Sequence, residues 1–204
     1  MRPVEISEVK NIADYELARP ELRPRMMALK DRRRVPLGPH LTFLFENRET
    51  VLYQVQEMMR IERIVKPEQI AHEVETYNEL IPAAGQLSAT LLVEFEDARE
   101  RDRQLRQLVG LERHIWIEVG GKRVPARFDQ RQMDDVRLSS VQYVKWQLDP
   151  EQVAAFPLQQ AKVVLAGGPV AQGVRLIADH PNYQAQYELS AEQREELQRD
   201  LTAK

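Results

Sequence analysis

The chain has 204 residues, 43% of them hydrophobic, and its 29 basic and 32 acidic side chains leave a formal net charge of -3. A chain of this length can bury a sizeable core, and its balanced charge gives no general attraction to nucleic acid or to acidic lipid. It has no cysteine, which excludes disulfides, thiolate-bound metal centres and a cysteine nucleophile. No apolar run reaches the length of a signal-peptide core or a membrane span, so we expect residues 1–204 to form a single domain in the cytoplasm, off the membrane.

The first part of the chain, residues 1–82, has mainly helical periodicity. Apolar residues at helical spacing after Pro20 predict one helix, which ends in the basic run at 31–34. Proline and glycine make residues 35–39 a turn-rich connector, and residues 41–46 read as a short buried strand.

Two further helices follow this strand. Asn47 is the predicted N-cap of a helix over 48–63. Pro67 suits the first position of the next helix, which we expect to stop before Pro82.

From Leu87 onwards, in the part over 83–204, the hydrophobic period changes to two. A strand over 87–95, a helix capped by Asp97 and a hairpin through Gly120-Gly121 are predicted in turn. Further strands are expected at 141–148, 162–166 and 174–178, and further capped helices at Asp149 and Ser190. Because the strand pairs are hairpin-like, the sequence predicts an α+β fold, with an N-terminal helical layer packed on a largely antiparallel sheet and capping helices in the C-terminal half.

The helix over 48–63 carries the sharpest single signal. Glu62 falls on the same side as Val51, Val55 and Met59, whereas Glu57 falls on the opposite side. A carboxylate that faces a core is costly without a partner. We therefore expect Glu62 to be buried in an ion pair with an arginine of the 32–34 run, with a ligand or catalytic role as the alternative.

Motifs for catalysis or cofactors are missing from the sequence. It has no phosphate-binding loop, nucleophile elbow or zinc-protease motif, so no cofactor is implied. His72, Glu75 and Glu79 could present an imidazole and two carboxylates on one helical face, as zinc or iron sites do. They lie opposite the apolar stripe of that helix, and a solvated face is the preferred interpretation.

Other polar segments also have two interpretations. The basic run at 32–34 favours a solvated or ion-paired helix end over a grip on phosphate. Trp116, Arg123 and Arg127 are predicted on the face of the hairpin opposite the core, which suits either a protein interface or a face covered by a helix. His180 lies in a turn sequence, which favours a structural role over acid–base chemistry.

Several spaced motifs together resemble one known family. They are Arg33-Arg34-Val35, Gly38-Pro39, Phe45-Glu46-x-Arg48-x-Thr50, Gln54-x-Gln56-Glu57-Met58-x-Arg60-x-Glu62, Glu73, Tyr77-Asn78-x-Leu80-x-Pro82, Leu87-x-Ala89-Thr90-Leu91 and Asp179-His180-Pro181-x-Tyr183. Over nearly its whole length the chain resembles the bacterial family of unknown function DUF3501, and the segment over 56–62 is the most specific part. The resemblance implies a cytosolic redox or peroxide-defence setting, with rubrerythrin-like or iron–sulphur proteins as partners.

Two classes of function remain open. The preferred class is an accessory or binding protein without cofactor chemistry of its own, with Trp116, Arg123 and Arg127 as the partner-binding candidates. The alternative is a metal- or anion-binding enzyme with a carboxylate/histidine site gathered around the 46–78 helices. The candidate functional cluster is Arg34, Glu46, Arg48, Gln56, Glu57, Arg60, Glu62, Glu73, Tyr77, Asn78 and His180. The candidate metal ligands are Glu57, Glu62, Glu73 and His40.

Overall fold

The structure is a computed structural model that describes residues 1–132, 134–157 and 173–203. Within these residues the strands form two antiparallel sheets, of order β1-β2-β3-β7-β6 and β5-β4-β8-β9. The strands of the first sheet are β1 (Arg34–Leu37), β2 (Leu41–Phe45), β3 (Gln86–Val93), β7 (Val141–Gln147) and β6 (Arg127–Phe128). The strands of the second are β5 (Lys122–Pro125), β4 (Ile115–Val119), β8 (Arg175–His180) and β9 (Tyr183–Glu188).

The main hydrophobic core lies between the two sheets. Phe43, Leu91 and Trp146 of the first sheet pack in one cluster with Ile117 and Leu176 of the second. Helices α4 (Ala98–Gln107), α5 (Pro150–Ala155) and α6 (Ala191–Thr202) and the 3-10 turns η2 (Leu111–Arg113) and η3 (Gln130–Gln132) complete the C-terminal half. The sandwiched sheets therefore leave one face of the five-stranded sheet for the N-terminal helices.

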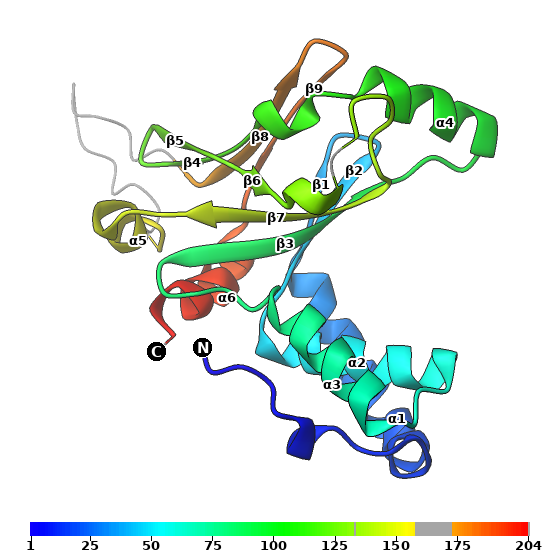
Figure 1. The fold of residues 1–204 in the computed structure, drawn as a ribbon. Coiled ribbons are helices and arrows are strands. Elements are labelled where there is room, and N and C mark those ends of the chain that lie inside the picture. The colour runs from blue at the N-terminus through cyan, green and yellow to red at the C-terminus, as the bar shows by residue number, and fades with distance from the viewer. Residues whose placement is uncertain (133, 158–172, 204) are drawn as a thin grey trace.

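The N-terminal helices cover that outer face. They are α1 (Ile12–Arg32), α2 (Arg48–Glu62) and α3 (Pro67–Asn78), with the 3-10 turn η1 (Ile6–Glu8) before them. In Figure 1 they lie together on the side of β3 and β7 away from β4, β5, β8 and β9. They have a core of their own around Val51, Val55, Met59 and Val74, against which Tyr143 of the sheet packs. The predicted α+β class, with a helical layer on antiparallel sheets, is thus confirmed.

Local sequence signals explain most element boundaries. The side chain of Asn47 accepts a hydrogen bond from the amide of Thr50 and caps α2, as predicted. Pro67 is the first residue of α3, and the caps at Asp97, Asp149 and Ser190 are also confirmed. The hairpin turns at Gly120-Gly121, both of which have positive φ angles.

Two predictions for the first forty residues differ from the structure. Helix α1 begins at Ile12 rather than after Pro20, because the buried Tyr15 ties its first turns to α2 and outweighs the missing amide hydrogen. The predicted connector at 35–39 contains strand β1, whose Pro36 is tolerated because β1 is an edge strand. The sheet therefore begins before the predicted division at residue 82.

The region around residue 180 also contains more strand than expected. Strand β9 follows the turn after His180 and pairs with β8 over its whole length. Its alternation of Tyr183, Ala185 and Tyr187 with polar residues is the period of a half-buried strand, a signal that our sequence interpretation missed. The strand predicted at 162–166 lies outside the described residues.

Candidate functional site

A cavity of about 380 Å³ lies between the helical layer and the outer face of the five-stranded sheet. It is lined by Met27, Lys30, Arg34, Leu44, Glu46, Val51, Gln54, Tyr77, Leu80, Thr90, Leu92, Val141 and Tyr143. Of the predicted functional cluster, it brings together Arg34, Glu46 and Tyr77. These three residues come from different elements, so only the fold could unite them.

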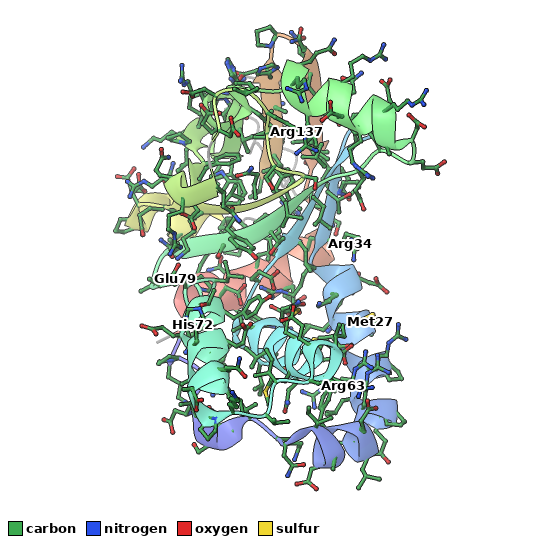
Figure 2. All side chains as sticks on the ribbon, turned by 45° about the vertical axis from the view of Figure 1, so that its right-hand side comes forward. Met27, Arg34, Arg63, His72, Glu79 and Arg137 are labelled. Atoms are coloured by element: carbon green, nitrogen blue, oxygen red, sulfur yellow. The ribbon has the colours of Figure 1, made fainter. Side chains whose placement is uncertain are left out.

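Strand register positions the floor of the cavity. Arg34, Leu44, Thr90 and Tyr143 are paired in turn across β1, β2, β3 and β7, so they form one row across the sheet. Paired residues of neighbouring strands point to the same face, which is here the face opposite the main core. Figure 2 shows Arg34 at the level where the sheet meets the helical layer.

Two cations share one side of this cavity. Burial lowers the pKa of Lys30, the positive charge of Arg34 lowers it further, and the negative charge of Glu46 opposes the shift. Among the described residues, neither the Lys30 ammonium nor the Arg34 guanidinium has a hydrogen-bond or ion-pair partner. The Lys30 ammonium nitrogen lies 5.0 Å from the centroid of the Tyr53 ring. Lys30 is half-buried and Arg34 is exposed, so the N–H groups of both side chains are open to an anion that enters the cavity.

Glu46 is the acidic member of the site, and each of its carboxylate oxygens accepts a hydrogen bond. The hydroxyl groups of Thr50 and Thr90 both donate to its carboxylate, one to each oxygen. Its side chain is buried at the end of β2, where Asn47 then starts α2. Because these hydroxyl groups hold its oxygens in place, Glu46 is not free to swing to the two cations.

Two tyrosine hydroxyls complete the polar lining. Burial raises the pKa of Tyr77, although a hydrogen bond with Gln54 opposes this shift. Burial also raises the pKa of Tyr143. Both phenols therefore stay protonated at neutral pH and can donate a hydrogen bond to an anion.

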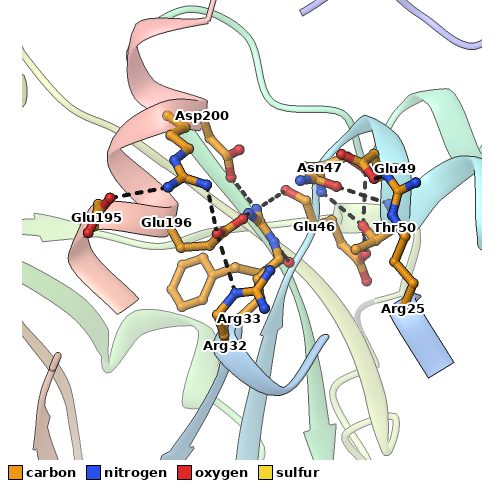
Figure 3. A network of polar contacts seen from close by, with 12 residues as sticks. Arg25, Arg32, Arg33, Glu46, Asn47, Glu49, Thr50, Glu195, Glu196 and Asp200 are labelled. Atoms are coloured by element: carbon orange, nitrogen blue, oxygen red, sulfur yellow. Dashed lines mark hydrogen bonds and ion pairs between the residues drawn. The ribbon is translucent and has the colours of Figure 1, made fainter. Parts of the chain in front are cut away.

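A buried arginine anchors the strand behind the cavity. Arg33 has no exposed surface, and its guanidinium donates to the backbone oxygens of Phe45 and Glu46. It also pairs with Glu196, at 3.1 Å, and with Asp200, both on α6 (Figure 3). Burial raises the pKa of Asp200 to about 6 even though Arg33 opposes the shift. Arg32 and Arg33 thus form an ion-paired helix end, as preferred, whereas Arg34 lies on β1 and has no ion-pair partner among the described residues. Arg33 fixes the backbone that carries Arg34 and Glu46.

Other residues of the predicted cluster hold the N-terminal segment in place. The side-chain amide of Gln56 bonds both backbone groups of Lys10, and the amide of Asn78 bonds both backbone groups of Val4. Arg48 forms an ion pair with Glu8. These contacts account for Arg48, Gln56 and Asn78 without a ligand.

The predicted roles of Glu57 and Glu62 are reversed. Glu62 is exposed, so the expectation of a buried ion pair with the 32–34 run is wrong. Helix α2 ends there: Arg63 takes a left-handed conformation, and the apolar stripe does not extend past Met59. Glu57 instead accepts hydrogen bonds from Tyr15, at 2.6 Å, and from Arg19, at 2.7 Å, because α1 packs along the side of α2 that we had read as polar.

Glu57 is therefore the ion-paired carboxylate of this helix. Burial raises the pKa of Glu57, but the hydrogen bonds from Arg19, Tyr15 and Arg60 outweigh this effect and lower the pKa to about 2. This accounts for Arg60 as well, which also reaches Glu16 at 3.7 Å.

The remaining predicted positions do not join the cavity. His72, Glu75 and Glu79 are exposed, as expected. The described part of the chain contains no group of three or more histidine and acidic side chains that could hold a metal, so Glu57, Glu62, Glu73 and His40 are not brought together. His180 is buried at the end of β8, before the predicted turn, and its ring contacts the backbone oxygen of Val109 and the backbone amide of Asn182.

The predicted partner-binding face is divided between the two sheets. The indole of half-buried Trp116 donates to Asp179 at 3.0 Å, and Arg123 pairs with the same carboxylate at 3.3 Å. Arg127 lies on β6 of the other sheet, so the prediction of one face with all three residues is wrong. The chain changes sheets at Ala126, which the sequence alone does not signal.

Sequence reasoning missed four polar residues of the cavity: Lys30, Gln54, Thr90 and Tyr143. Lys30 did carry a signal, because it follows buried Met26 by four residues and so lies on the inner side of α1. Tyr143 carried no such signal, because each face of its strand has both apolar and polar residues.

With this geometry in place, comparisons with known proteins assign the family. The chain belongs to the protein family of unknown function DUF3501, whose model matches residues 3–201. Its fold is similar to the crystal structure of a novel protein of unknown function from Burkholderia pseudomallei, with 28% identity and a TM-score of 0.85. The alignment covers 98% of this chain and 100% of that one. No curated protein matches the chain. No described helix has the length and apolar character needed to cross a membrane.

Proposed function

We propose that this chain is a binding protein for a small organic anion, which sits in the cavity between the helical layer and the sheet. The observation that carries the proposal is the pair Lys30 and Arg34, two adjacent cations that face the cavity without a hydrogen-bond or ion-pair partner among the described residues. Arginine and lysine together suit a carboxylate, because each donates charge-assisted hydrogen bonds. Tyr77 and Tyr143 supply further donors.

The other half of the cavity favours a ligand with a hydrocarbon body. This half has apolar walls on both the sheet side and the helix side, formed by Leu44, Val51, Leu80, Leu92 and Val141. Apolar lining with a few convergent polar groups is the usual character of a small-molecule site. The proposed ligand is therefore an amphipathic carboxylate rather than a bare inorganic ion.

This proposal develops the preferred expectation of a binding protein without cofactor chemistry of its own. It also keeps the anion-binding part of the alternative expectation. The cytoplasmic location rests on the apolar pattern of the sequence, and the redox setting and the rubrerythrin-like or iron–sulphur partners rest on the family resemblance. All of these stay predictions.

Titration calorimetry with octanoate tests the proposal, with octanamide as the uncharged control of equal length. We expect octanoate to bind and octanamide to bind at least about tenfold more weakly, the factor that about 1.4 kcal/mol of charge-assisted bonding gives. Lys30→Met should lose the octanoate preference, whereas Lys66→Met, on an exposed lysine outside the cavity, should keep it. Equal affinity for the two probes, or full binding by Lys30→Met, would refute the proposal.

A further inference from the structure

A second hollow, of about 340 Å³, adjoins the proposed anion site on the same face of the sheet. It is lined by Thr76, Glu79, Leu80, Gln86, Arg127, Phe128, Asp129, Arg131, Tyr143 and Lys145. The side chains of Leu80 and Tyr143 belong to the walls of both cavities. The two cavities are therefore neighbours, separated by these two side chains.

The second cavity repeats the charge arrangement of the first. Arg127 and Lys145 lie directly opposite each other on β6 and β7. Like charges at opposed positions of antiparallel strands destabilise a sheet. Neither of the two side chains has a hydrogen-bond or ion-pair partner within the part of the chain that the structure describes. Burial lowers the pKa of Lys145, although Glu79 and Asp129 oppose the shift.

The acidic residues of the second cavity are already engaged. Arg131 pairs with Asp129 at 2.7 Å and also with Glu79. The guanidinium thus holds both carboxylates, and Arg127 and Lys145 remain as the unpaired charges. Figure 2 shows Glu79 at the junction of sheet and helical layer, the level at which Arg34 also lies.

Sheet geometry gives the separation between the two cationic pairs. From Arg34 the row crosses three strand spacings to Tyr143, and Lys145 follows two residues later on the same face. Strand spacings of about 4.8 Å and a rise of about 3.4 Å per residue place the Cα atoms of Arg34 and Lys145 roughly 16 Å apart. Since both side chains are long, an anion of extended small-molecule length can reach both.

We infer that the ligand is a linear dianion with an apolar middle, such as a long straight-chain dicarboxylate, which bridges Lys30 and Arg34 in the first cavity to Arg127 and Lys145 in the second. The inference rests on the proposed function and adds a second anionic group to its ligand. Leu80 and Tyr143 lie where the hydrocarbon middle passes. The first cavity alone would bind the monoanion, and the second would select the longer dianion.

Binding of the monoanion by the first cavity and selection of the long dianion by the second can be tested separately with three probes: suberate, octanoate and succinate. Suberate and octanoate have equal chain length and differ in one carboxylate, whereas succinate has two carboxylates on a short chain. We expect suberate to bind about tenfold more tightly than octanoate, as one added charge-assisted contact gives, and succinate to lack this gain.

Variants then locate the second contact. Lys145→Gln should remove the advantage of suberate and leave octanoate affinity unchanged, whereas Lys30→Met should weaken both, and Lys66→Gln should change neither. If octanoate binds but suberate has no advantage, or if Lys145→Gln keeps the advantage, the bridging inference is overturned while the proposed function stands. If neither probe binds, both fail together with the assignment of Lys30.

Discussion

At the scale of single residues, the contacts of a charged side chain decide whether it is ion-paired, and its position on a helical wheel does not. Both Glu57 and Glu62 lie on α2, and the helical wheel assigned Glu62 to the core side. The wheel was wrong because it assumed one buried side, whereas α1 covers a second side and brings Tyr15 and Arg19 to Glu57. A helix that packs on two neighbours cannot be read from one stripe.

Removal of the Glu57 charge should destabilise the protein. Glu57→Gln leaves Arg19 with a weakened, half-buried partner and should cost about 2 kcal/mol in free energy of unfolding. Glu62→Gln, at an exposed site, should cost under about 0.5 kcal/mol. Urea denaturation of both variants measures this contrast, and equal losses would contradict the structure of α2.

The pH dependence of this difference follows from the lowered pKa of Glu57. In the unfolded chain the carboxyl has its usual pKa of 4.5, and in the folded protein about 2. Its stabilisation is therefore present above pH 4.5 and is lost as pH falls from 4.5 towards 2. The gap in unfolding free energy between the native chain and Glu57→Gln should narrow over this window.

At the scale of elements, α6 is fastened to the sheet by a buried charge cluster with more acid than base. Asp200 and Glu196 both face Arg33, and burial raises the pKa of Asp200 from 3.8 to about 6 (Figure 3). A raised pKa means that the folded protein prefers the protonated acid. Stability from this group is thus present below the unfolded pKa and is lost as pH rises through the folded one.

Asp200→Asn reports this loss, because asparagine imitates the protonated acid. The free energy of unfolding of the native chain should fall relative to Asp200→Asn as pH rises from about 4 to about 6, and the difference should be constant above that window. Thermal unfolding of both proteins across this range measures it. A difference that stays constant or rises over this window would show that Asp200 is ionised throughout and acts as a simple partner of Arg33.

Sequence signals predicted elements where the signal is local. The caps at Asn47, Asp97 and Ser190 and the Gly120-Gly121 turn are each set by a few adjacent residues, and all are confirmed. The predictions for helix α1 and strand β1 were wrong because proline disfavours both elements locally. Here tertiary packing outweighs that local effect.

At the scale of the whole molecule, the site is a product of topology. Arg34, Glu46 and Tyr77 were candidates from the sequence, but the place of Tyr143 in the cavity and the second cavity depend on strand order and register. The cavity lies between two well-packed cores, one between the sheets and one within the helical layer. Its two cations have no hydrogen-bond or ion-pair partner among the residues that the structure describes, which is why we propose that it binds a ligand.

The most direct test of that assignment is the position of bound octanoate in solution, measured by intermolecular nuclear Overhauser effects to assigned methyl groups. We expect contacts from the octanoate methylenes to the methyls of Leu44, Leu80 and Leu92, which line the cavity beside Lys30 and Arg34. These contacts should disappear in Lys30→Met and persist in Lys66→Met. Contacts confined to methyls outside the cavity, or the same cavity contacts in Lys30→Met, would contradict that assignment.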